Sequence, residues 1–508
     1  MNIVDNIDNN NIDNNNIDNN NIDNIDNNNV DNDNDDNDNL VKGGNKQKFL
    51  GEGSYGCTWN PGLDCYGKKN SKNNIINKIQ EINFYSENEI SISNTIKNIK
   101  NYSYRFSPVI SYCSVTFNKI INSNIDYNKC ENLFDEYINY EKNLFSLDKY
   151  LTPNKREQLL NIDYYMFYIK YIKGYTLRDF FKNYTTTPYI FYKIYIYSFY
   201  YLLNSISILI KNNIIHNDLH TSNIIYQIKK ERPIIIDFGL SFNTKQFYIT
   251  KKLTPSIDYK VMKNFFFNYK ENIYNHIIEK QFISFCIFNE YEYYDKYVEN
   301  DNEVNDLNKS IIDIFINNTI NSIANNNSIN YIFTLDELKY YKKYLQLYYY
   351  KFLDNKNYPY ISSIIKELLT HIYQYNDIYS LSISYIRIYF KRFYNKKEYA
   401  TTSKFIFIFE LLAQLFKKIM LPDPKYRINT YQFIQILQFI INYINSRNSY
   451  SCYDIRLFVQ LYYSCTAARP SIGLRPGRAN DARAPRWEPR KDGRVGTTYP
   501  VRAPAQPE

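Results

Sequence analysis

The sequence predicts a mixed α+β fold, and three stretches carry that prediction. Leu50–Trp59 interleaves glycines with apolar and β-branched residues, a pattern typical of a β-hairpin. Ile75–Ile79 is a short apolar run that indicates a strand, whereas Tyr189–Ile210 is long enough for three or more helical turns. Lys193 and Asn204 interrupt that long run, so we expect a buried helix and no membrane span.

Composition limits what single residues can mean. The 508 residues suggest two to four domains, and the chain holds 55 Tyr among 18% aromatic residues. Asn and Ile are also abundant, so an isolated Ile, Asn, Lys or Tyr carries little information, while Gly, His, Asp and Pro carry more. The net charge is +9, and no Arg-rich recognition element lies in the central part, so we expect no nucleic-acid binding.

Both ends of the chain differ from its centre. Residues 1–45 are a low-complexity Asn/Asp segment, with eleven Asp in residues 1–40, and we expect this segment to be disordered. Residues 466–508 hold seven Pro, eight Arg and seven Ala. We expect this tail not to pack. It is either a basic disordered tail or a piece of foreign coding sequence.

The cysteines follow no regular pattern. There are seven, at positions 57, 65, 113, 130, 286, 452 and 465, and we find no secretory leader. An odd number at irregular spacing predicts reduced thiols in a cytosolic protein. Cys57 and Cys65 could form half of a zinc site, but no second pair has a suitable spacing.

The most informative stretch runs from His216 to Gly239. It reads His-Asn-Asp-Leu-His-Thr-Ser-Asn-Ile-Ile, then a polar turn, then Pro-Ile-Ile-Ile-Asp-Phe-Gly. Asp218 could accept the proton of a substrate hydroxyl, while Asn223 and Asp237 offer hard oxygen ligands for Mg²⁺. Either half alone is a weak signal, but together they indicate phosphoryl transfer.

Upstream residues supply what a nucleotide site requires. In the Gly-x-Gly-x-x-Gly pattern the missing Cβ atoms let the backbone approach phosphates closely. The residues that we expect at the nucleotide are Leu50, Gly51, Gly53, Ser54, Tyr55, Gly56 and Thr58.

A lysine is expected next, in a strand, to hold the phosphates. Lys78 is the candidate because it lies in an apolar run, whereas Lys68, Lys69 and Lys72 lie in a polar stretch. An acidic residue on the following helix should form an ion pair with Lys78. Glu89 fits best, and Glu87 is the second candidate.

The segment Tyr164–Asp179 reads as a strand, a connector and a short helix. The backbone groups of Lys170 and Ile172 would read the adenine edge.

Together these residues resemble eukaryotic-type protein kinases over residues 48–445, and most of all the serine/threonine kinases of large DNA viruses. Gly53-Ser54-Tyr55-Gly56-Cys57, followed by Asn60-Pro61-Gly62-Leu63-Asp64-Cys65, carries the viral likeness. The resemblance implies a two-lobed fold, with a small β-rich N-lobe and hinge at 46–172 and a larger helical C-lobe at 173–447. It also implies ATP with Mg²⁺ (Mn²⁺ possible) and transfer of the γ-phosphoryl group to Ser or Thr hydroxyls of proteins.

The resemblance extends to residues that would support the site. Asp377, in Asp-Ile-Tyr-Ser-Leu, matches the start of a buried helix whose Asp braces the catalytic loop. Arg427, in Asp-Pro-Lys-Tyr-Arg, would pair with Glu279, and His216 would support the loop by packing. Between Glu279 and Asp377 lies an insertion, at about 286–370, that we expect to be helical around Leu335–Leu353. It could be a docking element or an insertion without a function, and we favour the second interpretation.

Four positions depart from the family pattern, and they leave two alternatives open. Asn217 stands in place of Arg, His220 in place of Lys, Ile76 in place of Ala and Ser382 in place of Gly. An atypical or small-molecule kinase, or a pseudokinase acting as a binding module, would also carry parts of the pattern. The resemblance further implies a monomer with protein substrates, in the cytoplasm, or in the host cytoplasm or virion if the protein is viral. Neither the substrate nor the role of the insertion can be inferred from the residues.

Asn217 generates a testable prediction. Because the Arg that reads an activation-loop phosphate is replaced, we expect activity without phosphorylation of that loop. Replacing every Ser, Thr and Tyr between Leu240 and Tyr274 should leave phosphoryl transfer intact in an assay on the folded protein. Lost activity in a variant that still folds would contradict this expectation.

Overall fold

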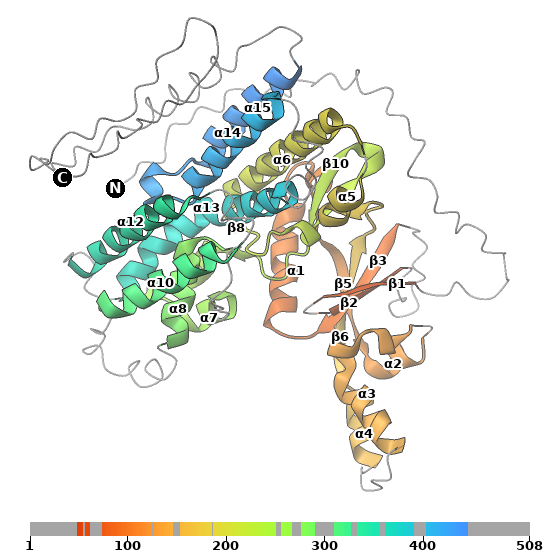
Figure 1. Cartoon of the computed structure of the whole chain (residues 1–508). Helices are drawn as coiled ribbons and strands as arrows, with labels where there is room; N and C mark the ends of the chain where they lie inside the picture. Colours follow the sequence, from red (N-terminus) through yellow and green to blue (C-terminus); the bar gives the residue numbers. More distant parts are fainter. Residues whose placement is uncertain are drawn as a thin grey trace, which may run out of the picture.

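A computed structural model describes residues 48–53, 56–60, 74–123, 125–145, 153–184, 186–249, 256–266, 276–289, 309–326, 333–354, 361–390 and 403–445. Strands gather around a five-stranded sheet in the first part of the described chain, and helices dominate the later part (Figure 1). The mixed α+β class predicted from the sequence is confirmed. The two-lobed arrangement remains a prediction. Residues 1–45, the 466–508 tail, Ser54, Tyr55 and Cys65 lie outside the described residues.

The strands are short. They are β1 (Lys48–Gly53), β2 (Gly56–Asn60), β3 (Ile75–Glu81), β4 (Phe106–Ser107), β5 (Val109–Thr116), β6 (Asp163–Lys170), β7 (Tyr175–Thr176), β8 (Ile214–Ile215), β9 (Ile224–Gln227), β10 (Arg232–Ile236), β11 (Phe242–Asn243), β12 (Tyr248–Ile249) and β13 (Ser256–Ile257).

The helices are longer towards the end of the chain. They are α1 (Phe84–Lys97), α2 (Phe117–Ile121), α3 (Glu131–Phe145), α4 (Pro153–Leu160), α5 (Leu177–Asn183), α6 (Pro188–Lys211), α7 (Tyr259–Phe266), α8 (Ile278–Asn289), α10 (Lys309–Ala324), α12 (Leu335–Asp354), α13 (Ile361–Tyr389), α14 (Ser403–Ile419) and α15 (Thr430–Asn445). Short 3₁₀ turns are η1 (Tyr102–Tyr104), η2 (Tyr127–Lys129), η3 (Thr221–Asn223), η4 (Ile228–Lys230), η5 (Thr244–Phe247) and η8 (Pro424–Tyr426).

The five-stranded sheet has the order β1-β2-β3-β6-β5 and is antiparallel throughout. Gly56 begins β2 where the backbones crowd. A Cβ atom there would collide with the carbonyl of Ile79 and lie 2.8 Å from Cβ of Gln80. The sequence therefore needs glycine at this point of the hairpin.

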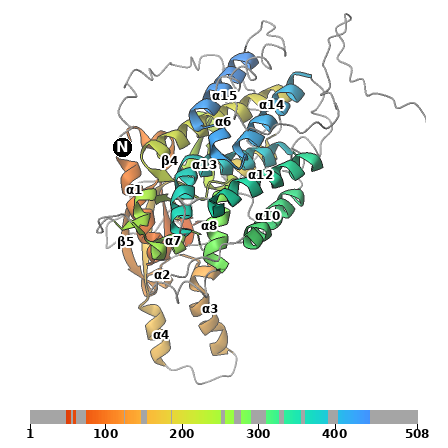
Figure 2. The ribbon, with the colours of Figure 1, turned by 90° about the vertical axis from the view of Figure 1, so that its left-hand side faces the viewer.

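One face of this sheet is covered by a small hydrophobic core. Side chains alternate between the faces of a strand, so Trp59 and Ile79 point away from Lys78. They pack with Met166 against Phe117 of α2 and Phe134 of α3. Figures 1 and 2 show α3 and α4 extending away from the sheet as a pair of helices.

A second sheet of four strands, β4-β10-β9-β7, carries the motif predicted to be catalytic. β9 and β10 are antiparallel, and Ile224 pairs with Ile235. Asn223 directly precedes β9, and Asp237 directly follows β10. The register therefore places both residues at the same end of this strand pair.

A larger hydrophobic core joins this second sheet to the helices. α6 begins at Pro188, where Thr187 caps the helix by accepting a hydrogen bond from the backbone N–H of Ile190. By length and composition, Tyr189–Lys211 could cross a membrane, but half of that segment is buried inside the protein. Phe199 and Leu203, for example, are fully buried in the larger core. The expected absence of a membrane span stays a prediction.

The inserted segment forms part of the same core. α12 spans Leu335–Asp354, the region predicted to be helical, and buries Leu345 and Tyr349. α13 then runs unbroken for 29 residues from Ile361 to Tyr389. Asp377 therefore lies inside a long helix and not at the start of one, as the resemblance implied. The reason is local, because no Gly or Pro interrupts residues 361–389.

The prediction that all cysteines are reduced is wrong for Cys57 and Cys130, which form a disulfide bond. Because its sulfur is used in this bond, Cys57 is not a zinc-binding thiolate, as the alternative with Cys65 required. Cys113 is also disulfide-bonded, and Cys286 is a buried free thiol. Cys57 and Cys130 are 73 residues apart and meet only through the tertiary fold, so their sequence spacing gave no sign of the bond.

A buried ion pair fixes the start of α8. Nη2 of Arg427 lies 2.7 Å from Oε1 of Glu279, and both side chains are completely buried. Arg427 also donates hydrogen bonds to the carbonyls of Leu421 and Pro422. Burial raises the pKa of Glu279, and the guanidinium opposes that shift.

This pair yields a prediction about stability. Arg427→Met should lower the free energy of unfolding by about 3–5 kcal/mol, because the buried Glu279 carboxylate loses its guanidinium partner. The His371 ring, 4.0 Å from Glu279, has its pKa lowered to about 4 by burial and so does not replace that charge. Arg427→Met combined with Glu279→Met should recover at least half of that loss in urea denaturation. Lys339→Met is the control, because it breaks an exposed pair with Asp336 and should cost less than about 1 kcal/mol. An equal loss in the single and double Arg427 variants would contradict this account.

Candidate functional site

Lys78 lies at the centre of a three-residue charge network. Its ammonium nitrogen lies 3.0 Å from Oε2 of Glu89 and 3.0 Å from Oδ1 of Asp237. Burial opposes the charged form, but the carboxylates of Asp237 and Glu89 outweigh it and raise the pKa of Lys78. The amine is therefore a fixed positive charge between two acids.

Glu89 reaches this position because of how α1 begins. Asn83 caps the helix by accepting hydrogen bonds from the N–H groups of Tyr85 and Ser86, and the Ser86 hydroxyl accepts one from the Asn83 N–H. Glu89 then follows in the second turn and is 3% exposed. The reserve candidate, Glu87, is in the first turn, and the salt bridge of Lys78 on this helix is with Glu89.

Asp237 comes directly after β10, with a backbone φ of 60°. Only a few residue types tolerate this left-handed conformation, and Asp is one of them. Burial would raise its pKa, but the Lys78 ammonium lowers it, so the carboxylate is ionised. Its side chain is 39% exposed, which leaves it open to a ligand from solvent.

Asp218 and Asn223 form a second contact at the same end of the β9–β10 pair. The Asn223 amide donates hydrogen bonds to the backbone carbonyl of Asp218, at 2.9 Å, and to its Oδ2, at 3.1 Å. The Asp218 side chain is 36% exposed. The amide therefore holds the carboxylate in one orientation while leaving it accessible.

The loop before Asp218 is braced from α13. The two carboxylate oxygens of Asp377 accept hydrogen bonds from the backbone N–H groups of His216, at 2.7 Å, and Asn217, at 3.0 Å. Nε2 of His216 lies 2.9 Å from the carbonyl of Ile236, and its ring packs against Phe238 with centroids 5.0 Å apart. His216 thus links this loop to β10, the strand that directly precedes Asp237.

The two departures next to Asp218 have structural roles. Asn217 has φ of 65°, which Asn tolerates, and its amide donates to the carbonyl of Leu240. His220 caps η3 by accepting a hydrogen bond from the Ser222 N–H, and its Nε2 lies 3.6 Å from Oδ2 of Asp218.

Leu50, Gly51, Gly53, Gly56, Thr58 and Lys170, among the predicted nucleotide-contact residues, lie on the five-stranded sheet. Thr58 pairs with Lys78 across β2 and β3, while Gly51 and Gly53 are on β1. Leu50 is 39% exposed. Lys170 ends β6, opposite Ile75 of β3, and its carbonyl accepts a hydrogen bond from the Ser107 hydroxyl. Ile172 lies two residues after β6 in the chain, and its role at adenine stays a prediction.

Two contacts at the site were not anticipated from the sequence. The Asn88 amide donates to the carbonyls of Gly239 and Ser241, at 3.3 and 2.6 Å, and so ties α1 to the segment after Asp237. The amine of Lys280 donates to the carbonyl of Asn217, at 3.3 Å. Asn is too common in this chain for Asn88 to stand out, and Lys280 is distant in sequence from its partner.

A cavity of about 160 Å³ lies between α1 and β5, and its lining includes Ile90, Asn94 and Tyr112. None of the charged residues described above lines it. We therefore do not assign it to the candidate site.

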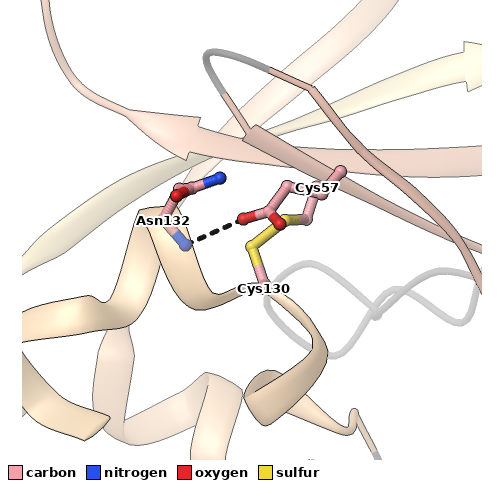
Figure 3. The surroundings of a disulfide bond; sticks show 4 residues. Cys57, Cys130 and Asn132 are labelled. Carbon is pink, nitrogen blue, oxygen red and sulfur yellow. Dashed lines mark hydrogen bonds between the residues drawn. A yellow bond between two sulfur atoms is a disulfide. The ribbon is translucent and has the colours of Figure 1, made fainter. Parts of the chain in front are cut away.

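A disulfide bond connects the glycine-rich hairpin to α3. Cys57 of β2 is bonded to Cys130, which directly precedes α3, and the two Cα atoms are 6.0 Å apart. Figure 3 shows a second link beside it, in which the backbone N–H of Asn132 donates to a carboxylate oxygen, at 2.8 Å, that belongs to Glu52 of β1. Both strands of the hairpin are therefore attached to the start of one helix.

Comparisons with known proteins add little to this geometry. No family model matches the chain, and no curated protein sequence matches it. Among solved structures, the chain is similar to the kinase PK-1 of Cydia pomonella granulovirus, with 18% identity and a TM-score of 0.24. The match covers 39% of this chain and 55% of that chain. A similarity this low carries no functional argument, so the functional reasoning rests on the contacts above.

The disulfide yields a prediction about the hairpin. Cys57→Ala with Cys130→Ala should lower the free energy of unfolding by roughly 2–4 kcal/mol, because the unfolded chain is no longer cross-linked. Urea denaturation with and without a thiol reductant measures this for the wild type. The double variant is the control, since its remaining response to reductant reports disulfide bonds other than Cys57–Cys130, including that of Cys113. A wild type that responds to reductant no more than the double variant would show that the Cys57–Cys130 bond contributes nothing.

Proposed function

We propose that this protein is an ATP-dependent kinase that transfers the γ-phosphoryl group to Ser or Thr hydroxyls of proteins. The observation that carries the proposal is the convergence of five side chains. Lys78, Glu89 and Asp237 form one contact network, and Asp218 with Asn223 forms another at the same end of the β9–β10 pair. An enzyme catalyses phosphoryl transfer mainly by positioning the reacting groups and by stabilising the negative charge on the phosphate oxygens.

The residues present suit a magnesium ion. Asn223 uses its amide nitrogen for both hydrogen bonds to Asp218, so these bonds do not occupy its amide oxygen. Asp237 offers an ionised and partly exposed carboxylate. Mg²⁺ prefers hard oxygen ligands of this kind, few in number, together with substrate phosphates. When bound, the metal would neutralise charge on the phosphate oxygens.

Asp218 has the position of the group that handles the acceptor. Its carboxylate is held by Asn223 and is more than one third exposed, so an incoming hydroxyl can reach it. In the proposed reaction it orients the hydroxyl and accepts its proton. Its neighbour His216 holds the loop through a backbone hydrogen bond and ring packing, with no role in proton transfer.

Lys78 has the position of the group that holds the nucleotide. It is the only residue that contacts both α1 and the end of β10 within the described network, and its charge is stabilised by two acids. A phosphate would find a preset positive charge there, because the lysine needs no reorganisation. The glycine-rich hairpin, on the neighbouring strands of the same sheet, would cover the phosphates.

An assay of phosphate transfer from radiolabelled ATP tests the proposal. With Mg²⁺ and a degenerate Ser/Thr peptide array, the wild type should label peptides, and Asp218→Ala should be slower by roughly 10²–10⁴-fold. Asp237→Asn should reduce activity as well, and raising the Mg²⁺ or Mn²⁺ concentration should recover part of it. Asp336→Ala, at an exposed carboxylate on α12, is the control and should retain full activity.

Three results would contradict the proposal. Equal rates for the wild type and Asp218→Ala would remove Asp218 from the mechanism. Transfer to small molecules but to no peptide would identify a small-molecule kinase. ATP binding without any transfer would identify a binding module.

A further inference from the structure

Lys280 is a buried cation outside the five residues of the proposed site. It lies in the first turn of α8 and is only 6% exposed. Its amine donates a hydrogen bond to the carbonyl of Asn217, at 3.3 Å, and lies 3.1 Å from Nδ1 of His276. The Asn217 carbonyl belongs to the peptide bond that leads into Asp218.

The charge of Lys280 is balanced by the loop and by α13. Burial lowers the pKa of Lys280 to about 7, while the attraction of Asp218 and Asp377 opposes that shift. Burying an amine is costly unless nearby groups compensate for lost water. These two acids are also the proposed base and the residue that braces its loop.

The loop itself offers no permanent cation. Residues 216–223 contain neither Lys nor Arg. His220 lies 3.6 Å from Asp218, but its Nδ1 is used to cap η3. Lys280 therefore brings to this loop a positive charge that its own sequence lacks.

The start of α8 explains how Lys280 is placed. Successive residues of a helix point about 100° apart, so Glu279 and Lys280 face different neighbours. Glu279 is fixed by its buried pair with Arg427, which leaves Lys280 directed at the loop. Asn217 is then held on both sides, since its N–H donates to Asp377 and its carbonyl accepts from Lys280.

We propose that Lys280 is a positioning residue for the proposed phosphoryl transfer. In its protonated form, the amine holds the peptide bond between Asn217 and Asp218 and provides a positive charge that attracts the Asp218 carboxylate. The inference rests on the proposed function and deepens it. Because Lys280 makes no contact with Lys78, Glu89 or Asp237 among the described interactions, its loss should affect turnover more than nucleotide binding.

The first test separates turnover from binding. Lys280→Met should lower kcat by about 10- to 100-fold, as expected for the loss of one charged hydrogen bond, with the KM for MgATP changed less than twofold. Lys280→Arg should restore kcat to within about threefold of the wild type, because it keeps the charge and the donor. Lys417→Met is the matched control, since it removes a partly buried lysine that pairs with Glu337 of α12, and kcat should be unchanged.

The second test is the pH profile of kcat, which a purely structural lysine would not alter. As pH rises above about 7, the Lys280 ammonium loses its proton, so the wild-type kcat should fall. In Lys280→Arg the charge persists, and that fall should disappear. The titratable groups that act on this amine are His276 on its own segment, Asp218 of the loop and Asp377 of α13. His220 of the loop acts on His276, and all four groups are present in both proteins. The pH comparison remains decisive if Lys280→Met fails to fold, which thermal denaturation would reveal.

The outcomes separate the two proposals. An active wild type with unchanged kcat in folded Lys280→Met, or with the same pH profile as Lys280→Arg, would overturn the role of Lys280 and leave the proposed function standing. A wild type that transfers no phosphate to any peptide would overturn the proposed function itself. A loss of MgATP binding in Lys280→Met, with kcat retained, would show that the residue acts at the nucleotide and not at the loop.

Discussion

The salt bridges of Lys78 are the constraint on which the candidate site depends. One ammonium group joins three elements that are distant in the sequence, because Lys78 is on β3, Glu89 on α1 and Asp237 after β10. A buried amine with one carboxylate would be poorly compensated, and a second carboxylate makes the positive charge stable. The Lys78 ammonium thereby links the five-stranded sheet to the end of β10 in the four-stranded sheet. Asn88 adds to this link, because its amide donates hydrogen bonds to the carbonyls of Gly239 and Ser241 in the segment after Asp237.

A second set of buried charges holds the other half of the site. Asp377 inside α13 accepts two backbone hydrogen bonds from the loop, and Arg427 fixes Glu279 at the start of α8. Lys280 then closes the arrangement by returning from α8 to the loop. Each of these charges would be costly alone in the interior, and each is compensated by another. The helices of the inserted segment contribute as well, because α12 buries Tyr348 and Tyr349 close enough to Glu279 and Arg427 to interact with both charges.

The sequence predicted the residues of this site better than the contacts among them. Asp218, Asn223 and Asp237 stood out through the spacing of His-x-Asp-x-x-x-x-Asn and Asp-Phe-Gly, and Lys78 stood out because it lies in a short apolar run. The mixed α+β class followed from the same runs. The Cys57–Cys130 bond, the unbroken course of α13 through Asp377 and the reach of Lys280 could not be predicted, since each depends on tertiary packing between distant segments. Local pattern determines which residues are unusual, while packing determines which of them meet.

The geometry of Asn217 connects its departure from the family pattern to the way the loop is held. Its backbone has a positive φ that Asn adopts at low cost, and its amide, N–H and carbonyl are engaged with Leu240, Asp377 and Lys280 respectively. An Arg at this position would add a mobile charge that needs an external anion for compensation. With Asn there, the loop is held by groups that belong to the chain itself and are buried with it. A positive charge near the loop comes from Lys280 of α8 and not from residue 217, which agrees with the prediction that the loop needs no added phosphate.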